Sequence, residues 1–264
     1  MSVFFNIKKV FCCKRKNKTP EGFCDGRRRR RRDCLGHACT TPDKYDIPYE
    51  PENNVHIAVC LGDIERVKKH FCQKECNMND RDTHNRTALH FACFYGNLEI
   101  VHLLVKNSCI IDVLDDEHST PLMKAVQSWE EKIVHFLLEK KADPNIRDTD
   151  GNTALHHAIY VGRPVLAGIL LAYGANIEKM TKDGLTPLLL ALREHKLCMA
   201  EYLIKQGADV HVHDTQQRNT LMYAIRSDSE EMVSLLLQHG VSPLLKDSFG
   251  WSALRYAMAG HRKV

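Results

Sequence analysis

Histidine and cysteine are the side chains of this sequence best suited to metal binding or catalysis. His90 and His156 hold the same place in a repeated hexapeptide, and neither has a second ligand at the one-turn spacing that a metal site on a helix requires. His156 and His157 are adjacent, so they point to different faces of a helix. The segment from Cys24 to Cys39 holds possible zinc ligands without a recognised finger spacing. We therefore expect no metal site and no cofactor.

Other catalytic patterns are missing from the sequence. It contains no glycine-rich phosphate loop in a strand-to-helix context, no nucleophile elbow and no paired acidic motif. The expectation is that the protein is not an enzyme.

Composition indicates an intracellular protein. The 264 residues are 44% hydrophobic and 27% charged, which are ordinary values for soluble globular proteins. No apolar run approaches the roughly 18 residues that a spanning helix needs, and no secretory signal begins the chain. Eleven cysteines at irregular spacings favour reduced thiols. We expect a location in the cytoplasm, at the inner face of the plasma membrane or in the nucleus.

Charge divides the chain into two parts. Residues 1–47 carry 13 Lys/Arg and 5 Asp/Glu, a net charge of +8, whereas the remainder has a net charge of −4. We interpret residues 1–50 as a basic, cysteine-containing, disordered tail and residues 51–264 as the folded domain.

A period of 33 residues dominates the folded domain. A hexapeptide with Thr, Asn or Ser first, Leu third and Ala sixth recurs at Thr87–Ala92, Thr120–Ala125, Thr153–Ala158, Thr186–Ala191, Asn219–Ala224 and Ser252–Ala257, after a degenerate copy at Val55–Ala58. The first residue can cap a helix, and proline is tolerated at the next position. Each copy therefore predicts the start of a helix.

A second helix follows in each unit. Gly62, Gly96 and Gly162 can end the first helix in the left-handed conformation, whereas Trp129, His195 and Asp228 stand at that place elsewhere and predict irregular turns. Apolar segments such as Ile100–Leu104 then predict a broadly buried helix, and polar turns close the unit. Such units must stack, so we predict an all-α solenoid of about six repeats, the first degenerate and the last truncated.

The repeated motifs resemble the ankyrin repeat over residues 54–264. The likeness rests on the Thr-Pro-Leu-His pattern, Gly-Ala-Asp and Asp-x-x-Gly at 33-residue spacing. It is closest to the POTE and ankyrin-repeat-domain-26 group, through Asn79–Asp82, Asn85–His90, Gly151–His156 and Leu185–Leu190, in the ankyrin segment only and without the coiled coil that often follows there. The resemblance implies an ankyrin-repeat solenoid in which the motif histidine is a structural hydrogen-bonding residue.

The resemblance also implies a non-catalytic adaptor or scaffold that binds another protein through its hairpin tips and the concave face of its first helices. The corresponding positions at the tips are His84, Arg86, Glu117, His118, Asp150, Asn152, Lys182, Arg218, Phe249 and Trp251. On the helices they are Phe94, Tyr95, Tyr160, Arg193 and Arg226. Aromatic and arginine side chains are frequent binding anchors.

The tail supports two alternative functions. An amphipathic stretch followed by Cys12, Cys13 and a basic cluster is typical of a lipid-anchored protein on an anionic membrane. The run Arg27, Arg28, Arg29, Arg30, Arg31 and Arg32 is compatible with nuclear import, a solvated tail, membrane electrostatics or nucleic-acid contact. Few aromatics lie near it for base stacking, so nucleic-acid binding is the least favoured of these.

Overall fold

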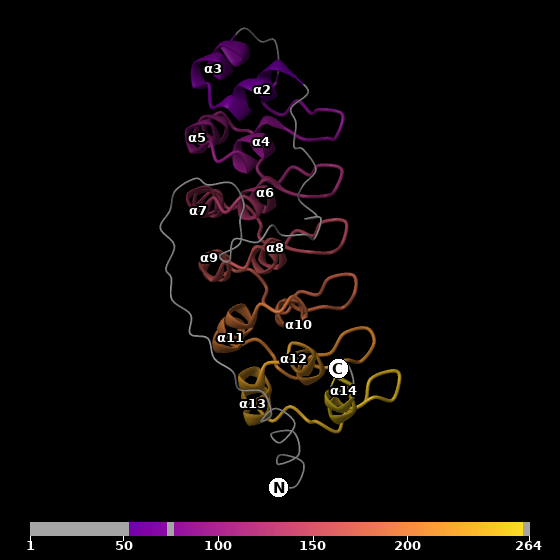
Figure 1. The fold of residues 1–264 in the computed structure, drawn as a ribbon. Coiled ribbons are helices and arrows are strands. Elements are labelled where there is room, and N and C mark those ends of the chain that lie inside the picture. Colours follow the sequence, from indigo (N-terminus) through magenta and orange to yellow (C-terminus); the bar gives the residue numbers. More distant parts are fainter. Residues whose placement is uncertain (1–52, 73–76, 261–264) are drawn as a thin grey trace.

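The computed structural model describes residues 53–72 and 77–260, and within them the chain forms six antiparallel helix pairs followed by a single helix. The first helices of the pairs form one column in Figure 1 and the second helices form another. The first column holds α2 (Asn54–Leu61), α4 (Ala88–Phe94), α6 (Pro121–Gln127), α8 (Ala154–Val161), α10 (Pro187–Arg193), α12 (Thr220–Arg226) and the last helix, α14 (Ala253–Gly260). The second holds α3 (Ile64–Cys72), α5 (Leu98–Lys106), α7 (Glu131–Glu139), α9 (Pro164–Ala172), α11 (Leu197–Lys205) and α13 (Glu230–Gln238). We call these the inner and outer helices.

The predicted solenoid is confirmed. Loops project from the inner column on one side of the stack (Figure 1), and the helices of neighbouring repeats contact one another along both columns. The Leu and Ala of each hexapeptide are buried, except that Leu254 in the last copy is partly buried, and one continuous core runs from Val55 to Ala257. None of the helices in these residues is long and apolar enough to cross a membrane. The expectations for Cys12, Cys13, the arginine run and the segment from Cys24 to Cys39 concern residues outside the described part.

The inner helices begin where the hexapeptide predicts. The side chains of Thr120, Thr186 and Asn219 accept hydrogen bonds from the backbone N–H three residues further on, and proline fills the first position of α6 and α10. In α4 and α8 a histidine completes the cap instead. The backbone N–H groups of Thr87 and Thr153 donate to Nδ1 of His90 and His156, each at 3.1 Å.

The same histidines connect consecutive repeats. Nε2 of His90 lies 3.1 Å from the carbonyl oxygen of Ser119, and Nε2 of His156 lies 3.3 Å from that of Leu185. Because Nδ1 accepts a hydrogen bond, the proton of the neutral ring is on Nε2, which donates to the next repeat. Both rings are fully buried. The predicted structural role of the motif histidine is thus confirmed.

The turns between the inner and outer helices correct one prediction. Trp129, His195 and Asp228 have φ values of 64°, 54° and 54°, close to the 67° of Gly162, so these turns are regular. Trp129 and Glu130 donate to the carbonyls of Val126 and Ala125, which is the same pattern that Gly162 makes with Ile159. Packing of the two helices in each repeat imposes the left-handed conformation even where the residue disfavours it.

Candidate protein-binding surface

The hairpins share one turn geometry, and we count them in chain order. Five of them contain an aspartate at the same position: Asp82, Asp115, Asp148, Asp214 and Asp247. One oxygen of each carboxylate accepts hydrogen bonds from the backbone N–H groups two and four residues later; for Asp148 the distances are 2.9 and 2.7 Å. Thr181 stands at this place in the remaining hairpin and accepts from the N–H of Leu185 at 3.2 Å. These bonds fix the tight turn of each hairpin.

The second carboxylate oxygen contacts the side chain nine residues later, on the inner helix. Lys124 Nζ lies 2.9 Å from Asp115, His157 Nε2 lies 3.0 Å from Asp148, and the hydroxyls of Tyr223 and Tyr256 lie 2.8 and 2.6 Å from Asp214 and Asp247. The apolar Leu190 stands nine residues after Thr181, which has no second acceptor oxygen. A hydrogen-bond donor thus stands nine residues after an aspartate, and an apolar residue stands nine residues after the threonine. The sequence analysis missed this pairing, although the constant separation of nine residues could have revealed it.

In the first hairpin a different side chain binds the second carboxylate oxygen. Phe91 stands nine residues after Asp82 and cannot donate a hydrogen bond. Arg86 instead donates from Nε to Asp82 at 2.6 Å, and its guanidinium lies 4.9 Å from the centre of the Phe91 ring.

These contacts alter the ionisation of the hairpin groups. Burial alone would raise the pKa of Asp148, but hydrogen bonds from His157 and Asn152 outweigh it and hold the pKa at about 2. Burial, together with the hydrogen bond to its carboxylate, raises the pKa of Tyr223 to about 12 and that of Tyr256 likewise to about 12. At neutral pH the carboxylates are charged and the phenols are neutral, as donors to carboxylates must be.

Two of the residues predicted to contact a partner are buried in the hairpins. Arg86 is 8% exposed and Asn152 is 2% exposed, and their side chains bind Asp82 and Asp148. The prediction that these two side chains lie at the tips is wrong, because the position four residues after the aspartate points into the turn. Arg218, at the equivalent position, is half-buried and donates to Asp214 at 2.7 Å.

The remaining tip residues form an exposed row. His84, Glu117, His118, Asp150, Lys182 and Phe249 are exposed, whereas Trp251 is half-buried against Tyr256 and Arg255. Backbone hydrogen bonds connect successive tips: Asp116 donates to His84, Thr149 to Glu117, Lys182 to Asp150 and Ser248 to Gln216, at 2.9 to 3.1 Å. The tips are therefore held in register along the stack.

The predicted helix positions lie at the opposite ends of the inner helices. Tyr95 is 39% exposed, and its ring packs edge-on against that of Phe94 at 5.4 Å. Arg193 donates to the Tyr160 hydroxyl at 3.2 Å, which joins two neighbouring repeats. Phe94, Tyr160 and Arg193 are half-buried and Arg226 is exposed. An inner helix of seven or eight residues is about 11 Å long, so these ends lie roughly that far from the start of the helix, where the hairpin joins it.

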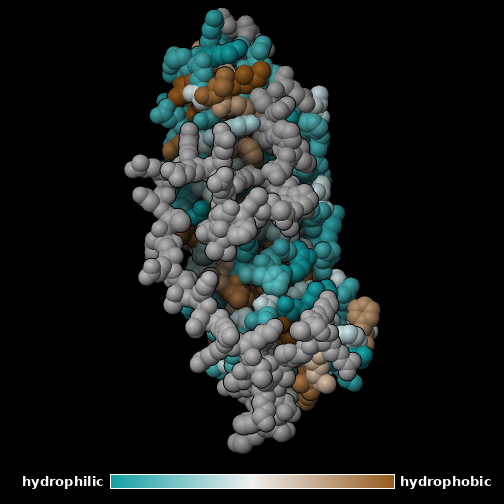
Figure 2. All heavy atoms as spheres, viewed as in Figure 1, coloured by the Kyte–Doolittle hydropathy of each residue, from teal (hydrophilic) through white to brown (hydrophobic). Residues whose placement is uncertain are grey.

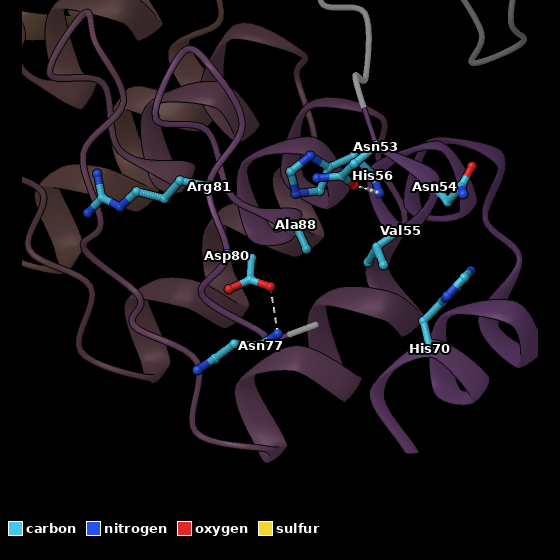
Figure 3. Close-up of a pocket in the computed structure, with 9 residues that line it drawn as sticks. All are labelled: Asn53, Asn54, Val55, His56, His70, Asn77, Asp80, Arg81 and Ala88. Atoms are coloured by element: carbon cyan, nitrogen blue, oxygen red, sulfur yellow. Dashed lines mark hydrogen bonds between the residues drawn. The ribbon is translucent and has the colours of Figure 1, made fainter. Parts of the chain in front are cut away.

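A cavity of about 430 Å³ lies at the N-terminal end of the stack, away from most of these residues. Figure 3 shows that Asp80 accepts from the backbone of Asn77, at 2.7 Å, and that Asn53 accepts from the backbone of His56, at 2.8 Å. Arg81 also lines this cavity, and it donates to the carbonyl of Leu114. No group of three or more potential metal ligands occurs in the residues that the structure describes. We assign no chemistry to this cavity.

Known proteins with similar sequences and structures agree with the fold. The sequence model of a family described as ankyrin repeats (3 copies) matches residues 55–148, 129–214 and 198–264. Human Ankyrin repeat domain-containing protein 7 is 37% identical over 70 residues, which is 26% of this chain and only 28% of that protein. The narrower likeness to the POTE and ankyrin-repeat-domain-26 group stays a prediction.

Two crystal structures are similar over most of the chain. The human ASB11 ankyrin repeat domain has a TM-score of 0.69 and 26% identity, covering 78% of this chain and 91% of that one. The ankyrin repeat domain of Bcl-3, a member of the IkappaB protein family, has a TM-score of 0.71 and 26% identity, covering 78% and 94%. Because the family match extends over most of its length, this chain belongs to the ankyrin-repeat family, whose repeat domains are protein–protein interaction modules.

Proposed function

We propose that the protein is a non-catalytic adaptor or scaffold that binds a partner through the hairpin tips and the exposed ends of the inner helices. The observation that carries this proposal is a set of aromatic and arginine side chains at the ends of three inner helices: Phe94 and Tyr95 at α4, Tyr160 at α8 and Arg193 at α10. These side chains remain partly exposed although the core beneath them is complete. Aromatic and arginine residues on a preformed surface are the usual anchors of an interface.

Affinity capture with the full chain, followed by mass spectrometry, identifies the partner, and substitution then locates its site. Changing Tyr95 and Tyr160 to Ala should weaken binding by about 2 kcal/mol or more, roughly 30-fold, with little change in melting temperature. Glu139 and Lys205 are exposed on outer helices and provide the matched control pair. Equal losses from both pairs would place the binding surface elsewhere.

We also propose that the tail sets the location of the protein. One acyl chain anchors only marginally, so acylation of Cys12 and Cys13 beside a basic cluster would provide the two signals that stable attachment needs. Replacing both cysteines with Ser should release a fluorescent fusion from the cell periphery, and neutralising Arg27 to Arg32 should reduce nuclear entry. An unchanged distribution after both changes would refute both roles.

A further inference from the structure

Exposed apolar side chains lie at the ends of the first three inner helices. Leu61 is the last residue of α2, Tyr95 follows the last residue of α4, and Trp129 lies two residues beyond α6; we call these three residues the turn row. Leu61 is 72%, Tyr95 39% and Trp129 49% exposed. One apolar side chain per repeat is therefore exposed over three consecutive repeats, and the exposed Arg163 of the fourth repeat lies beside Trp129.

Trp129 is the least expected member of the turn row. Its φ is 64°, a conformation that Gly62, Gly96 and Gly162 adopt at the equivalent place without steric cost. The guanidinium of Arg163 lies 4.6 Å from the centre of its ring. A half-exposed tryptophan held at an unfavourable backbone position is more readily explained by a binding role than by local stability.

The sign of the charge changes along the turn row. The carboxylate of Glu130 lies so close over Gly96 that a Cβ at that glycine would collide with it. One to two repeats further on, Arg163 lies over Trp129 and Lys196 lies over Gly162. The row is therefore acidic toward α6 and basic toward α8 and α10, which favours a partner with acidic residues at one end.

The spacing of the repeats selects the conformation of the partner. Neighbouring packed helices lie about 8–10 Å apart, and an α-helix advances about 10.5 Å in seven residues. A helix parallel to the stack with an apolar residue in each heptad therefore presents one anchor to each repeat. An extended strand covers the same distance in about three residues, which places successive anchors on opposite faces.

We propose that the turn row binds an amphipathic α-helix of a partner protein, with apolar residues at heptad spacing and acidic residues at the end that lies over Arg163 and Lys196. This inference rests on the proposed function, because the turn row borders the same surface and shares Tyr95 with it. Hydrophobic side chains also gather at the last hairpin (Figure 2), where Leu244 and Phe249 are 67% and 68% exposed. They lack the regular spacing, so they serve as the control.

The probe is a synthetic three-heptad helix with one Leu in each heptad, Lys at one end and Glu at the other, labelled with fluorescein. Anisotropy with the full chain should show saturable binding below about 100 µM. Two comparison peptides, one with the leucines moved out of heptad register and one with the Glu residues replaced by Lys, should bind at least about 10-fold more weakly. Equal binding of the three peptides, or no binding of the first, would overturn the proposal.

Variants of the protein locate the peptide. Leu61→Ser and Trp129→Ala should each weaken binding about 10-fold or more, whereas Leu244→Ser combined with Phe249→Ser should not. Arg163→Glu combined with Lys196→Glu should reverse the preference and restore binding of the Lys-ended peptide, a result that misfolding cannot produce. An unaltered affinity of Trp129→Ala would refute the site. If the designed helix fails while Tyr95→Ala with Tyr160→Ala still releases the captured partner, the helix is wrong and the adaptor function stands.

Discussion

The two buried motif histidines predict that the fold loses stability in mildly acidic solution. In each ring Nδ1 accepts the N–H of the capping threonine, so protonation would place two protons against each other. Burial of the imidazole lowers the pKa of His90 to about 3 and that of His156 to about 4. In the unfolded chain both groups titrate near 6.5.

The sign and size of the effect follow from linkage. Because the folded pKa values are depressed, the unfolded state binds more protons below pH 6.5, and the free energy of unfolding falls as pH falls. Between pH 6.5 and pH 5, a span of about 1.5 pH units, the unfolded histidine binds a proton while the folded ring remains neutral. Over this span the free energy of unfolding falls by about 1.4 kcal/mol per pH unit for each histidine. The loss is about 2 kcal/mol for each histidine and about 4 kcal/mol for both. It continues until pH reaches the folded values, near 4 and 3.

Urea unfolding followed by circular dichroism at pH 7, 6 and 5, at constant ionic strength, measures this dependence. This window lies above the titration of Asp148, whose pKa is about 2, so its carboxylate stays charged in the folded state. His90→Gln and His156→Gln keep side chains that can both accept and donate, and each should remove about half of the pH dependence. A double variant with the same pH dependence as the parent protein would show that other groups cause it.

Two further predictions concern stability. Asp228 holds a φ of 54°, so Asp228→Gly should stabilise the fold by about 0.5 kcal/mol in urea unfolding, the difference between the strain relieved and the entropy that glycine adds to the unfolded chain. A destabilised variant would show that the aspartate side chain contributes more than its backbone strain costs. Lys124→Leu should cost about 3 kcal/mol, because it leaves the carboxylate of Asp115 buried without its cation. Adding Asp115→Thr should recover most of that loss, since Thr181 and Leu190 occupy these places in the fourth hairpin; equal stability of the single and double variants would contradict the pairing.

The fold could be predicted from sequence because its determinants are local and repeated. Thr120 and Thr186 cap helices as their types predict, with Pro at the next position. The turn at Trp129 could not be predicted, because its left-handed conformation comes from the packing of α6 against α7 and not from the preference of tryptophan. The preference of a non-glycine residue against the left-handed conformation is worth about 1 kcal/mol, and the packing of the two helices outweighs it.

The candidate site was harder to predict because polar residues in a hairpin serve two purposes. Nothing in the type of Arg86 or Asn152 distinguishes a side chain that binds a partner from one that completes a turn. The distinction comes from Asp82 and Asp148, four residues earlier, whose carboxylates draw those side chains inward. Sequence alone marks the hairpin, whereas geometry decides which of its positions face outward.

That geometry limits which hairpin side chains are available to the partner that we propose. The aspartate and the residue four places later form the base of the turn, and the inner-helix residue nine places later completes it. The backbone at four of the tips is also engaged, since it donates to a carbonyl of the preceding tip, and at the tip after Asp214 the hydroxyl of Thr215 donates to Asp183 instead. The side chains between those base positions, such as His118, Lys182 and Phe249, are exposed and can vary without loss of these bonds. Under the proposed function, any partner specificity of the hairpins would therefore come from these few tip side chains, arranged in a row whose spacing the stack itself fixes.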